Sequence, residues 1–185
     1  MWYAIQTKTG RERELQDLLK KYRDETGYRN CFQLKRETVR RYQGDCIIYT
    51  ETLFPGYLFV DTDDPLTLYV KLKKTPKFSK LLGREEIFGA EDDEEPVFHA
   101  ISSDEQKFLE NLMGDDAEYV VRLSPVEVDE ERNITKCGGA LAHYKDGIVK
   151  KRIRLRYVVI RLTLLGRTRE VKLGIRLKGD KTNVK

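Results

Sequence analysis

The sequence is poor in the residues that build disulfide frameworks and metal sites. Its 185 residues include three cysteines and two histidines. Cys31, Cys46 and Cys137 are odd in number and far apart, so they fit neither a disulfide framework nor a metal knuckle. His99 and His143 lie beside no cysteine pair at metal-ligand spacing. We therefore expect no metal site, and a reducing cellular compartment.

Catalytic and nucleotide-binding signatures are also missing. The sequence contains neither of the glycine-rich phosphate loops G-x-x-x-x-G-K-[ST] and G-x-G-x-x-G, and no G-x-S-x-G nucleophile motif. Paired carboxylates such as Asp92-Asp93 and Asp115-Asp116 fall in predicted turns, where solvation is their usual role. An enzyme is therefore the weakest interpretation, and we expect no cofactor.

Long apolar runs are absent as well. No stretch approaches the ~20 apolar residues that span a bilayer. The N-terminal sequence MWYAIQTK lacks the basic segment, apolar stretch and cleavage site of a secretory signal. We expect a cytoplasmic protein that does not bind membranes and acts as a monomer.

The charge that is present is divided unevenly. Residues 1–118 hold 18 Lys and Arg against 24 Asp and Glu, a net −6, whereas residues 119–185 hold 17 against 7, a net +10. Together they give the +4 of the whole chain. Such asymmetry suggests two segments with different partners, and the basic segment is the candidate for binding a polyanion.

The N-terminal segment has the pattern of a mixed α+β domain. Leu15, Leu18, Leu19 and Tyr22 form an apolar stripe that predicts a helix over 11–25. Asp64-Pro65 predicts a second helix start, and Ser102-x-x-Glu105 a third. Alternating or apolar runs predict strands at 2–7, 32–42, 46–50 and 57–60, with a hairpin turn at 43–45 and a bend at 55–56. We expect an α/β sandwich with an antiparallel sheet over residues 1–113.

Strand signals alone follow a short polar linker at residues 114–118. They lie at 119–123, 148–156, 157–165 and 170–177, with turn signals at 138–139, 146–147 and Gly166. Several short strands in so short a segment predict a small all-β barrel over residues 119–185.

The most unusual stretch is Lys150–Leu162, KKRIRLRYVVIRL. If it is a strand, Arg152, Arg154 and Arg156 share one face at ~6.6 Å intervals, close to the spacing of successive phosphates. One interpretation is a solvated edge strand that charge keeps soluble. The other is a surface that follows a phosphate backbone.

Two groups of side chains could serve partners. Further basic residues accompany the arginines, namely Lys136, Lys145, Lys150, Lys151, Arg161, Arg167, Arg169 and Lys172. His143 is a possible RNA contact, and Tyr144 and Tyr157 are possible stacking groups, although a core position is the preferred interpretation of Tyr157. The N-terminal segment instead carries aromatic residues at positions 2, 3, 54, 57, 59, 69 and 78. Most of these are expected in the core, and part of the uncovered sheet face is left for a protein partner.

Two motifs resemble one known family. LFPGYLFV at 53–60, after Trp2-Tyr3 and a helix, and TPKFSKLLG at 75–83 are similar to the N-terminal domain of NusG-family transcription elongation factors. Residues 139–175 resemble the family's KOW domain, an SH3-like barrel, with glycines and Arg167 at the expected turns. The departures, Ala140 for proline, His143 for glycine and the basic run 150–156, look most like the LoaP paralogues.

The resemblance implies a processive antiterminator. Residues 1–113 would dock on the β′ clamp helices of RNA polymerase, and the family's contact residues map onto Phe54, Tyr57, Phe59 and Leu81. The basic KOW domain would bind an RNA hairpin in a nascent leader transcript. The RNA-binding candidates are Lys136, His143, Lys145, Lys150, Lys151, Arg152, Arg154 and Arg156.

Two other functions remain open. A general NusG-like factor would use the barrel to bind a ribosomal subunit or a termination factor, and the +10 charge of residues 119–185 argues against this. A ribosome-associated KOW protein would leave the N-terminal aromatic motif unexplained.

Overall fold

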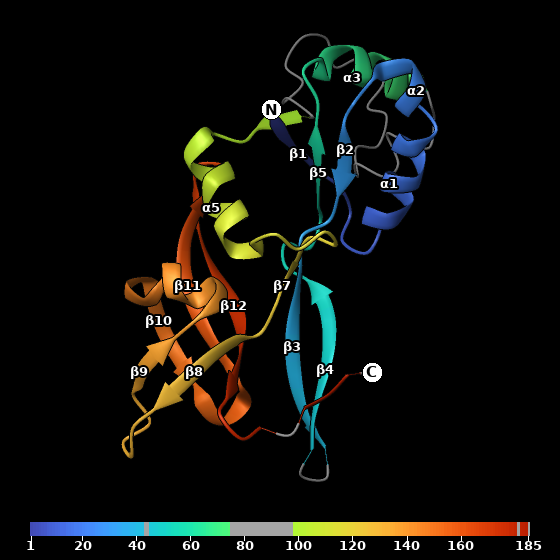
Figure 1. Cartoon of the computed structure of the whole chain (residues 1–185). Helices are drawn as coiled ribbons and strands as arrows, with labels where there is room; N and C mark the ends of the chain where they lie inside the picture. Colours follow the sequence, from blue (N-terminus) through green and yellow to red (C-terminus); the bar gives the residue numbers. More distant parts are fainter. Residues whose placement is uncertain (43–44, 75–97, 181, 185) are drawn as a thin grey trace. The chain divides into compact units, whose positions relative to one another are not determined.

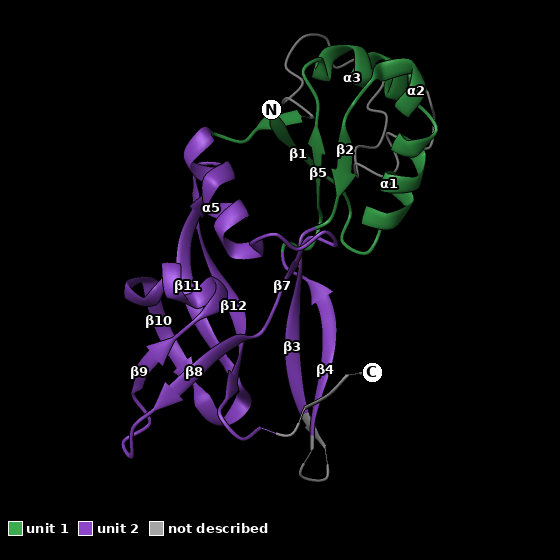
Figure 2. Ribbon diagram, viewed as in Figure 1, with its two compact units in different colours: residues 1–33, 54–102 green, residues 34–53, 103–185 purple. Residues whose placement is uncertain are grey.

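The computed structural model describes residues 1–42, 45–74, 98–180 and 182–184 (Figure 1). They form two compact units (Figure 2). Unit 1 comprises residues 1–33 and 54–102, and unit 2 comprises residues 34–53 and 103–185. The chain therefore leaves unit 1, contributes a hairpin to unit 2, and returns. None of the helices in these described ranges is long and apolar enough to cross a membrane.

Unit 1 is a four-stranded antiparallel sheet with helices on one face. Its elements are β1 (Trp2–Gln6), α1 (Glu12–Lys20), α2 (Arg23–Thr26), β2 (Asn30–Phe32), β5 (Tyr57–Asp61), α3 (Pro65–Lys73) and β6 (Phe98–Ala100). The strand order is β2-β5-β1-β6. Gly27 ends α2 in the left-handed conformation, with φ of +63°. Asp64 caps α3 by accepting a hydrogen bond from the Thr67 amide at 2.9 Å, which confirms the predicted helix start.

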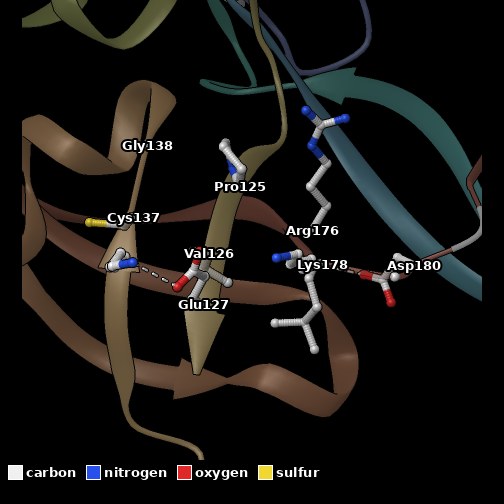
Figure 3. Close-up of a pocket in the computed structure, with 11 residues that line it drawn as sticks. Pro125, Val126, Glu127, Cys137, Gly138, Arg176, Lys178 and Asp180 are labelled. Atoms are coloured by element: carbon white, nitrogen blue, oxygen red, sulfur yellow. Dashed lines mark hydrogen bonds and ion pairs between the residues drawn. The ribbon is translucent and has the colours of Figure 1, made fainter. Parts of the chain in front are cut away.

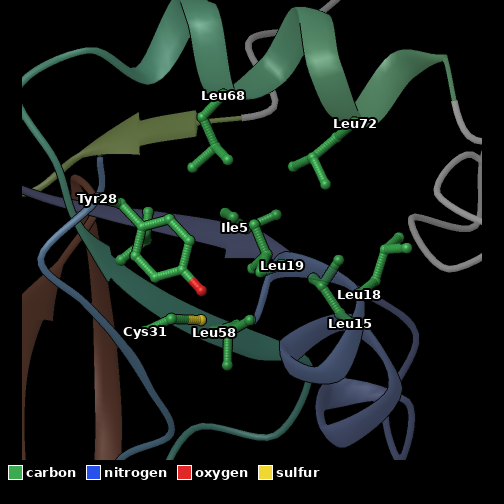
Figure 4. Packing of buried hydrophobic residues seen from close by; sticks show 10 residues of the cluster. Ile5, Leu15, Leu18, Leu19, Tyr28, Cys31, Leu58, Leu68 and Leu72 are labelled. Atoms are coloured by element: carbon green, nitrogen blue, oxygen red, sulfur yellow. The ribbon is translucent and has the colours of Figure 1, made fainter. Parts of the chain in front are cut away.

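The core of unit 1 lies between the sheet and its helices (Figure 4). Strand alternation sends Ile5, Leu58 and Val60 toward the helices, where leucines of α1 and α3 pack on them. The predicted stripe is confirmed for Leu15, Leu18 and Leu19, which are buried. The helix predicted over 11–25 is divided into α1 and α2, and Tyr22 lies half-buried between them. The sheet's other face carries aromatic residues, which are described below.

Unit 2 contains the hairpin, one α-helix and the C-terminal strands. Its strands are β3 (Lys35–Tyr42), β4 (Asp45–Thr52), β7 (Val120–Val121), β8 (Ser124–Val128), β9 (Ile134–Cys137), β10 (Ile148–Arg152), β11 (Tyr157–Leu164), β12 (Arg167–Leu177) and β13 (Thr182–Val184). Its helices are α5 (Ser103–Met113) and three short 3₁₀ turns, η1 (Gly139–His143), η2 (Lys145–Gly147) and η3 (Ile153–Leu155).

These strands form two sheets. One has the order β10-β11-β12-β8-β9, with β8 and β12 parallel. The other has the order β13-β4-β3-β7, so the predicted hairpin is present but outside the sheet of unit 1. The α+β class is confirmed, and the closure of the C-terminal strands into a KOW barrel stays a prediction.

The unit boundary differs from the expected domain boundary. Helix α5 and the hairpin at 34–53 group with the C-terminal strands, whereas the sequence pattern assigns both to residues 1–113. The expected linker at 114–118 is an ordered turn: Asp116 accepts hydrogen bonds from the amides of Glu118 and Val120 and from Arg122.

The strand predicted over residues 148–156 is wrong in its second half. Strand β10 ends at Arg152, Ile153 turns inward to 8 % exposure in η3, and Arg156 adopts a left-handed conformation with φ of +59°. An ion pair holds Arg156 in this conformation, so the three arginines do not form a ladder on one strand face.

Candidate nucleic-acid interface and aromatic face

The exposed part of the basic segment is short and dense. Lys150, Lys151, Arg152 and Arg154 are all exposed. Within the described part of the chain, none of them has an ion-pair partner, so four cations in five positions face solvent together. Among the described strands, β10 pairs only with β11, which places Lys150, Lys151 and Arg152 on an edge strand, and Arg154 follows in η3. Such a cluster can neutralise phosphates without first breaking internal ion pairs.

Arg156 belongs to the interior instead. Its guanidinium makes a bidentate pair with Asp180, with Nε–Oδ2 at 2.7 Å and Nη2–Oδ1 at 2.6 Å, and donates to the Ile153 carbonyl at 2.7 Å. Both side chains of the pair are only 9 % exposed. The carboxylate raises the pKa of Arg156 further above its already high value. The alternating pattern of the sequence could not predict that Arg156 is buried in an ion pair, because Asp180 lies 24 residues away.

The loop before β10 carries three residues that the sequence suggested for RNA binding, and only two of them are exposed. His143 and Lys145 are exposed. Tyr144, a predicted stacking group, packs on Phe108 of α5 with ring centroids 4.4 Å apart and donates its hydroxyl hydrogen to the Phe108 carbonyl at 2.9 Å. Burial raises the pKa of Tyr144. Tyr144 thus anchors the loop to α5, and His143 and Lys145 are the loop residues left to contact a ligand.

Lys136 lines a cavity of about 470 Å³ at the ends of β8, β9 and β12 (Figure 3). Its ammonium group pairs with Glu127 at 3.2 Å. Asp180 also lines this cavity and is engaged by Arg156. The Lys136 ammonium is thus already paired with a carboxylate, unlike the four cations at the β10 edge.

The hairpin adds residues that the sequence patterns did not single out. Arg40 of β3 and Tyr49 of β4 line a groove of unit 2 together with Arg154 and Tyr157. The alternation of Arg36, Thr38 and Arg40 along β3 was visible in the sequence. This alternation does not predict that the hairpin faces the C-terminal strands, because that placement depends on contacts between residues far apart in the sequence.

Aromatic rings connect across the other face of the unit 1 sheet. Trp2 meets Phe32 edge-on at 5.0 Å, Phe32 stacks on Phe59 at 5.8 Å, and Phe54 meets Phe59 at 6.2 Å between centroids. Of the predicted polymerase contacts, Phe54 and Phe59 are buried and Tyr57 is half-buried. Leu81 lies outside the described residues.

The Pro55-Gly56 bend that precedes β5 is held by a buried carboxylate. Glu12, 6 % exposed, accepts a hydrogen bond from the Gly56 amide at 2.6 Å, and the Gly56 carbonyl accepts one from the Thr7 amide at 2.8 Å. Burial of Glu12 would raise its pKa, but hydrogen bonds from the amides of Gly56, Glu12 and Gly10 outweigh burial and lower the pKa. The turn before the aromatic strand is therefore fixed by α1.

The part of the chain that contains this bend, this helix and most of this sheet also matches a protein-family model. The model described as "Transcription termination factor nusG" matches residues 1–95. The chain belongs to the NusG family. It is therefore a factor of transcription elongation or termination, a class of proteins that bind RNA polymerase. No curated protein shows significant similarity to the chain.

The NusG match covers unit 1 up to residue 95 and the hairpin at 34–53. It supports the N-terminal motif of the sequence, LFPGYLFV, as a family feature. It does not extend to the C-terminal strands, whose role has to be argued from their own residues.

Proposed function

We propose that the protein is a specialised NusG-type antiterminator that binds RNA polymerase through unit 1 and a hairpin of the nascent RNA through its C-terminal basic residues. The observation that carries the RNA part is the exposed cluster Lys150, Lys151, Arg152 and Arg154, with no ion-pair partner among the described residues. His143 and Lys145 precede it in the loop. Arg156 acts by shaping the turn and not by touching RNA.

The polymerase part rests on family membership and on the aromatic face. Phe54, Tyr57, Phe59 and Leu81 are the positions that the family resemblance assigns to the β′ clamp helices. Because Phe54 and Phe59 are buried, we assign them to shaping the surface and Tyr57 to direct contact. A half-buried tyrosine keeps part of its ring area for contact with a partner.

Tethering links the two activities. Once unit 1 is bound to polymerase, the basic cluster is held near emerging RNA, which raises its effective concentration there. Phosphate neutralisation gives an affinity that falls with salt. A double-stranded RNA stem is recognised largely by its shape and backbone, which suits a cluster of exposed cations.

The test is RNA binding by the full-length protein, with Lys150, Lys151 and Arg152 all changed to glutamine. We expect the affinity for a hairpin to fall by tenfold or more at low salt, and the salt dependence to become shallower by about three phosphate contacts. The matched control removes three exposed charges from unit 1, at Lys8, Arg13 and Lys21. Equal losses in both variants would show that net charge, and not this cluster, governs binding.

A second candidate is favoured by one observation. Val149 and Leu155, which lie on either side of the cluster in the sequence, are 43 % and 57 % exposed. Exposed apolar residues among cations also suit a protein partner, as in a general NusG-like factor that binds a ribosomal subunit or a termination factor. This function would be favoured if the protein binds either partner, if Leu155→Ser removes that binding, and if the affinity for an RNA hairpin is negligible even at low salt.

A further inference from the structure

A groove of about 700 Å³ lies within unit 2, lined by the β3–β4 hairpin on one side and by η3, β11 and β12 on the other. Its volume is in the ~300–1,000 Å³ range of ligand sites. The lining residues that matter for binding are Arg40, Tyr49, Arg154, Leu155, Tyr157 and Lys172. The groove is thus mostly cationic and aromatic.

The walls of the groove are fixed by close backbone contacts. A Cβ atom on Gly174 of β12 would lie 2.4 Å from the Glu37 carbonyl oxygen of β3, so only glycine permits this approach. Arg36 donates to the Lys172 carbonyl at 2.8 Å and pairs with Glu51 at 2.7 Å. Since Arg36 neutralises Glu51, the charge that remains available in the groove is positive.

The groove contains two adjacent pairs of an aromatic ring and a cation. The Arg40 guanidinium carbon lies 5.5 Å from the centroid of the Tyr49 ring, and the Lys172 ammonium lies 5.3 Å from that of Tyr157. Strand register produces both pairs: Tyr49 is opposite Thr38, two residues from Arg40, and Lys172 is opposite Val159, two residues from Tyr157. In the described ranges, neither cation has an ion-pair partner.

We propose that this groove binds unpaired RNA next to the hairpin, with bases stacked on Tyr49 and Tyr157 and phosphates on Arg40, Arg154 and Lys172. This inference rests on the proposed RNA function and adds a second, single-strand site to it. Single-strand sites combine aromatic platforms with backbone-tracking cations. A duplex hides the faces of its bases, so a stem could use the cations but not the rings. Arg154 ends the basic cluster and lines the groove, which makes the two sites continuous.

The test compares a blunt RNA hairpin with the same hairpin carrying a short single-stranded tail that contains 2-aminopurine. The full-length protein is used. We expect the tail to raise affinity about tenfold, equivalent to about 1.4 kcal/mol, and 2-aminopurine fluorescence to be quenched by stacking. Tyr49→Leu and Tyr157→Leu should each remove most of both effects while leaving the affinity for the blunt hairpin unchanged.

Conservative variants separate stacking from folding. Tyr49→Phe and Tyr157→Phe keep the rings and should keep the quenching. Arg40→Gln, at an exposed position, should weaken only the tailed RNA and lower its salt slope by about one phosphate contact, whereas Arg132→Gln outside the groove should not. Circular dichroism melts identify any variant that fails to fold, and Arg40→Gln then still tests the groove.

The inference would be overturned, and the proposed function left intact, if the blunt hairpin binds but the tail does not raise its affinity. Full quenching in the leucine variants would have the same consequence. Displacement of the tail by oligoglutamate as efficiently as by unlabelled single-stranded RNA would mean that the groove recognises negative charge alone, and would also overturn it. Failure of the blunt hairpin to bind at low salt would instead refute the proposed function.

Discussion

Each unit contains a turn held by a buried charged side chain, and the two turns are held differently. In unit 1, Glu12 accepts a hydrogen bond from the Gly56 amide, so backbone dipoles stabilise its charge, and no cation among the described residues pairs with it. In unit 2, Arg156 is paired with Asp180 and also donates to the carbonyl of its own turn. Backbone donors remain when the carboxylate is neutralised, but a buried guanidinium has no substitute for its partner. The second turn should therefore be the more fragile of the two.

The largest effect is expected from breaking the ion pair. Asp180→Ala leaves Arg156 with an uncompensated buried charge, which should lower the free energy of unfolding by about 3–5 kcal/mol. Replacing both partners, Arg156→Met with Asp180→Leu, should restore most of that loss. Denaturant unfolding followed by circular dichroism measures both. A loss below about 1 kcal/mol in Asp180→Ala would mean that the turn does not depend on the pair.

The unit 1 turn can be broken through its glycine. Gly56 has φ of +81°, and an added Cβ would lie 3.1 Å from the Thr7 carbonyl oxygen. Gly56→Ala should therefore cost about 2 kcal/mol in thermal or denaturant unfolding. Gly166 is the matched control, because its φ is +66° and no atom lies within 4 Å of an added Cβ. Gly166→Ala should cost about 1 kcal/mol, and equal costs would show that crowding at Thr7 is unimportant.

The contribution of Glu12 to the stability of the unit 1 turn should depend on pH. Its folded-state pKa is lowered from 4.5, so the stability it contributes is present above that pH and is lost as pH falls through the lower folded value. Glu12→Gln keeps an acceptor for the Gly56 amide but loses the charge-assisted strength, about 1 kcal/mol at pH 7. Unfolding measured from neutral pH to acid should show a shallower acid loss in the variant. An unchanged pH profile would assign the acid sensitivity to other groups.

The smallest effect is expected at Arg154, two residues from Arg156. Arg154 is exposed and has no ion-pair partner in the described ranges, so Arg154→Gln should change stability by less than about 0.5 kcal/mol. The same substitution should weaken RNA binding in a filter-binding or anisotropy assay. A large loss of stability would show that the two arginines share a structural role.

Local patterns in the sequence predicted the elements well. The stripe of α1, the Asp64 cap of α3, the β3–β4 hairpin and the strands β11 and β12 on either side of Gly166 all follow from side-chain periodicity and turn residues. The NusG motif at 53–60 was also visible, because it is a continuous stretch, and the family match bears it out.

Three features were not predictable in this way. Alternation extended the basic strand to Arg156 because the pattern cannot reveal a carboxylate 24 residues later. Tyr144 looked like a free stacking group, and its packing on Phe108 depends on α5. The groove combines residues 36–51 with 154–174, which come together only when the hairpin lies on β12.

By itself, the sequence determined the position of most helices and of several strands, the NusG resemblance and the excess of positive charge after residue 118, because periodicity, motifs and composition are local properties. The tertiary structure alone decided which of those charges are available. Arg154 faces solvent and Arg156 is buried, although both belong to one alternating pattern, because a distant carboxylate stabilises only the second in the interior. The same long-range packing placed Arg40 and Tyr49 beside the C-terminal cations and so formed the groove.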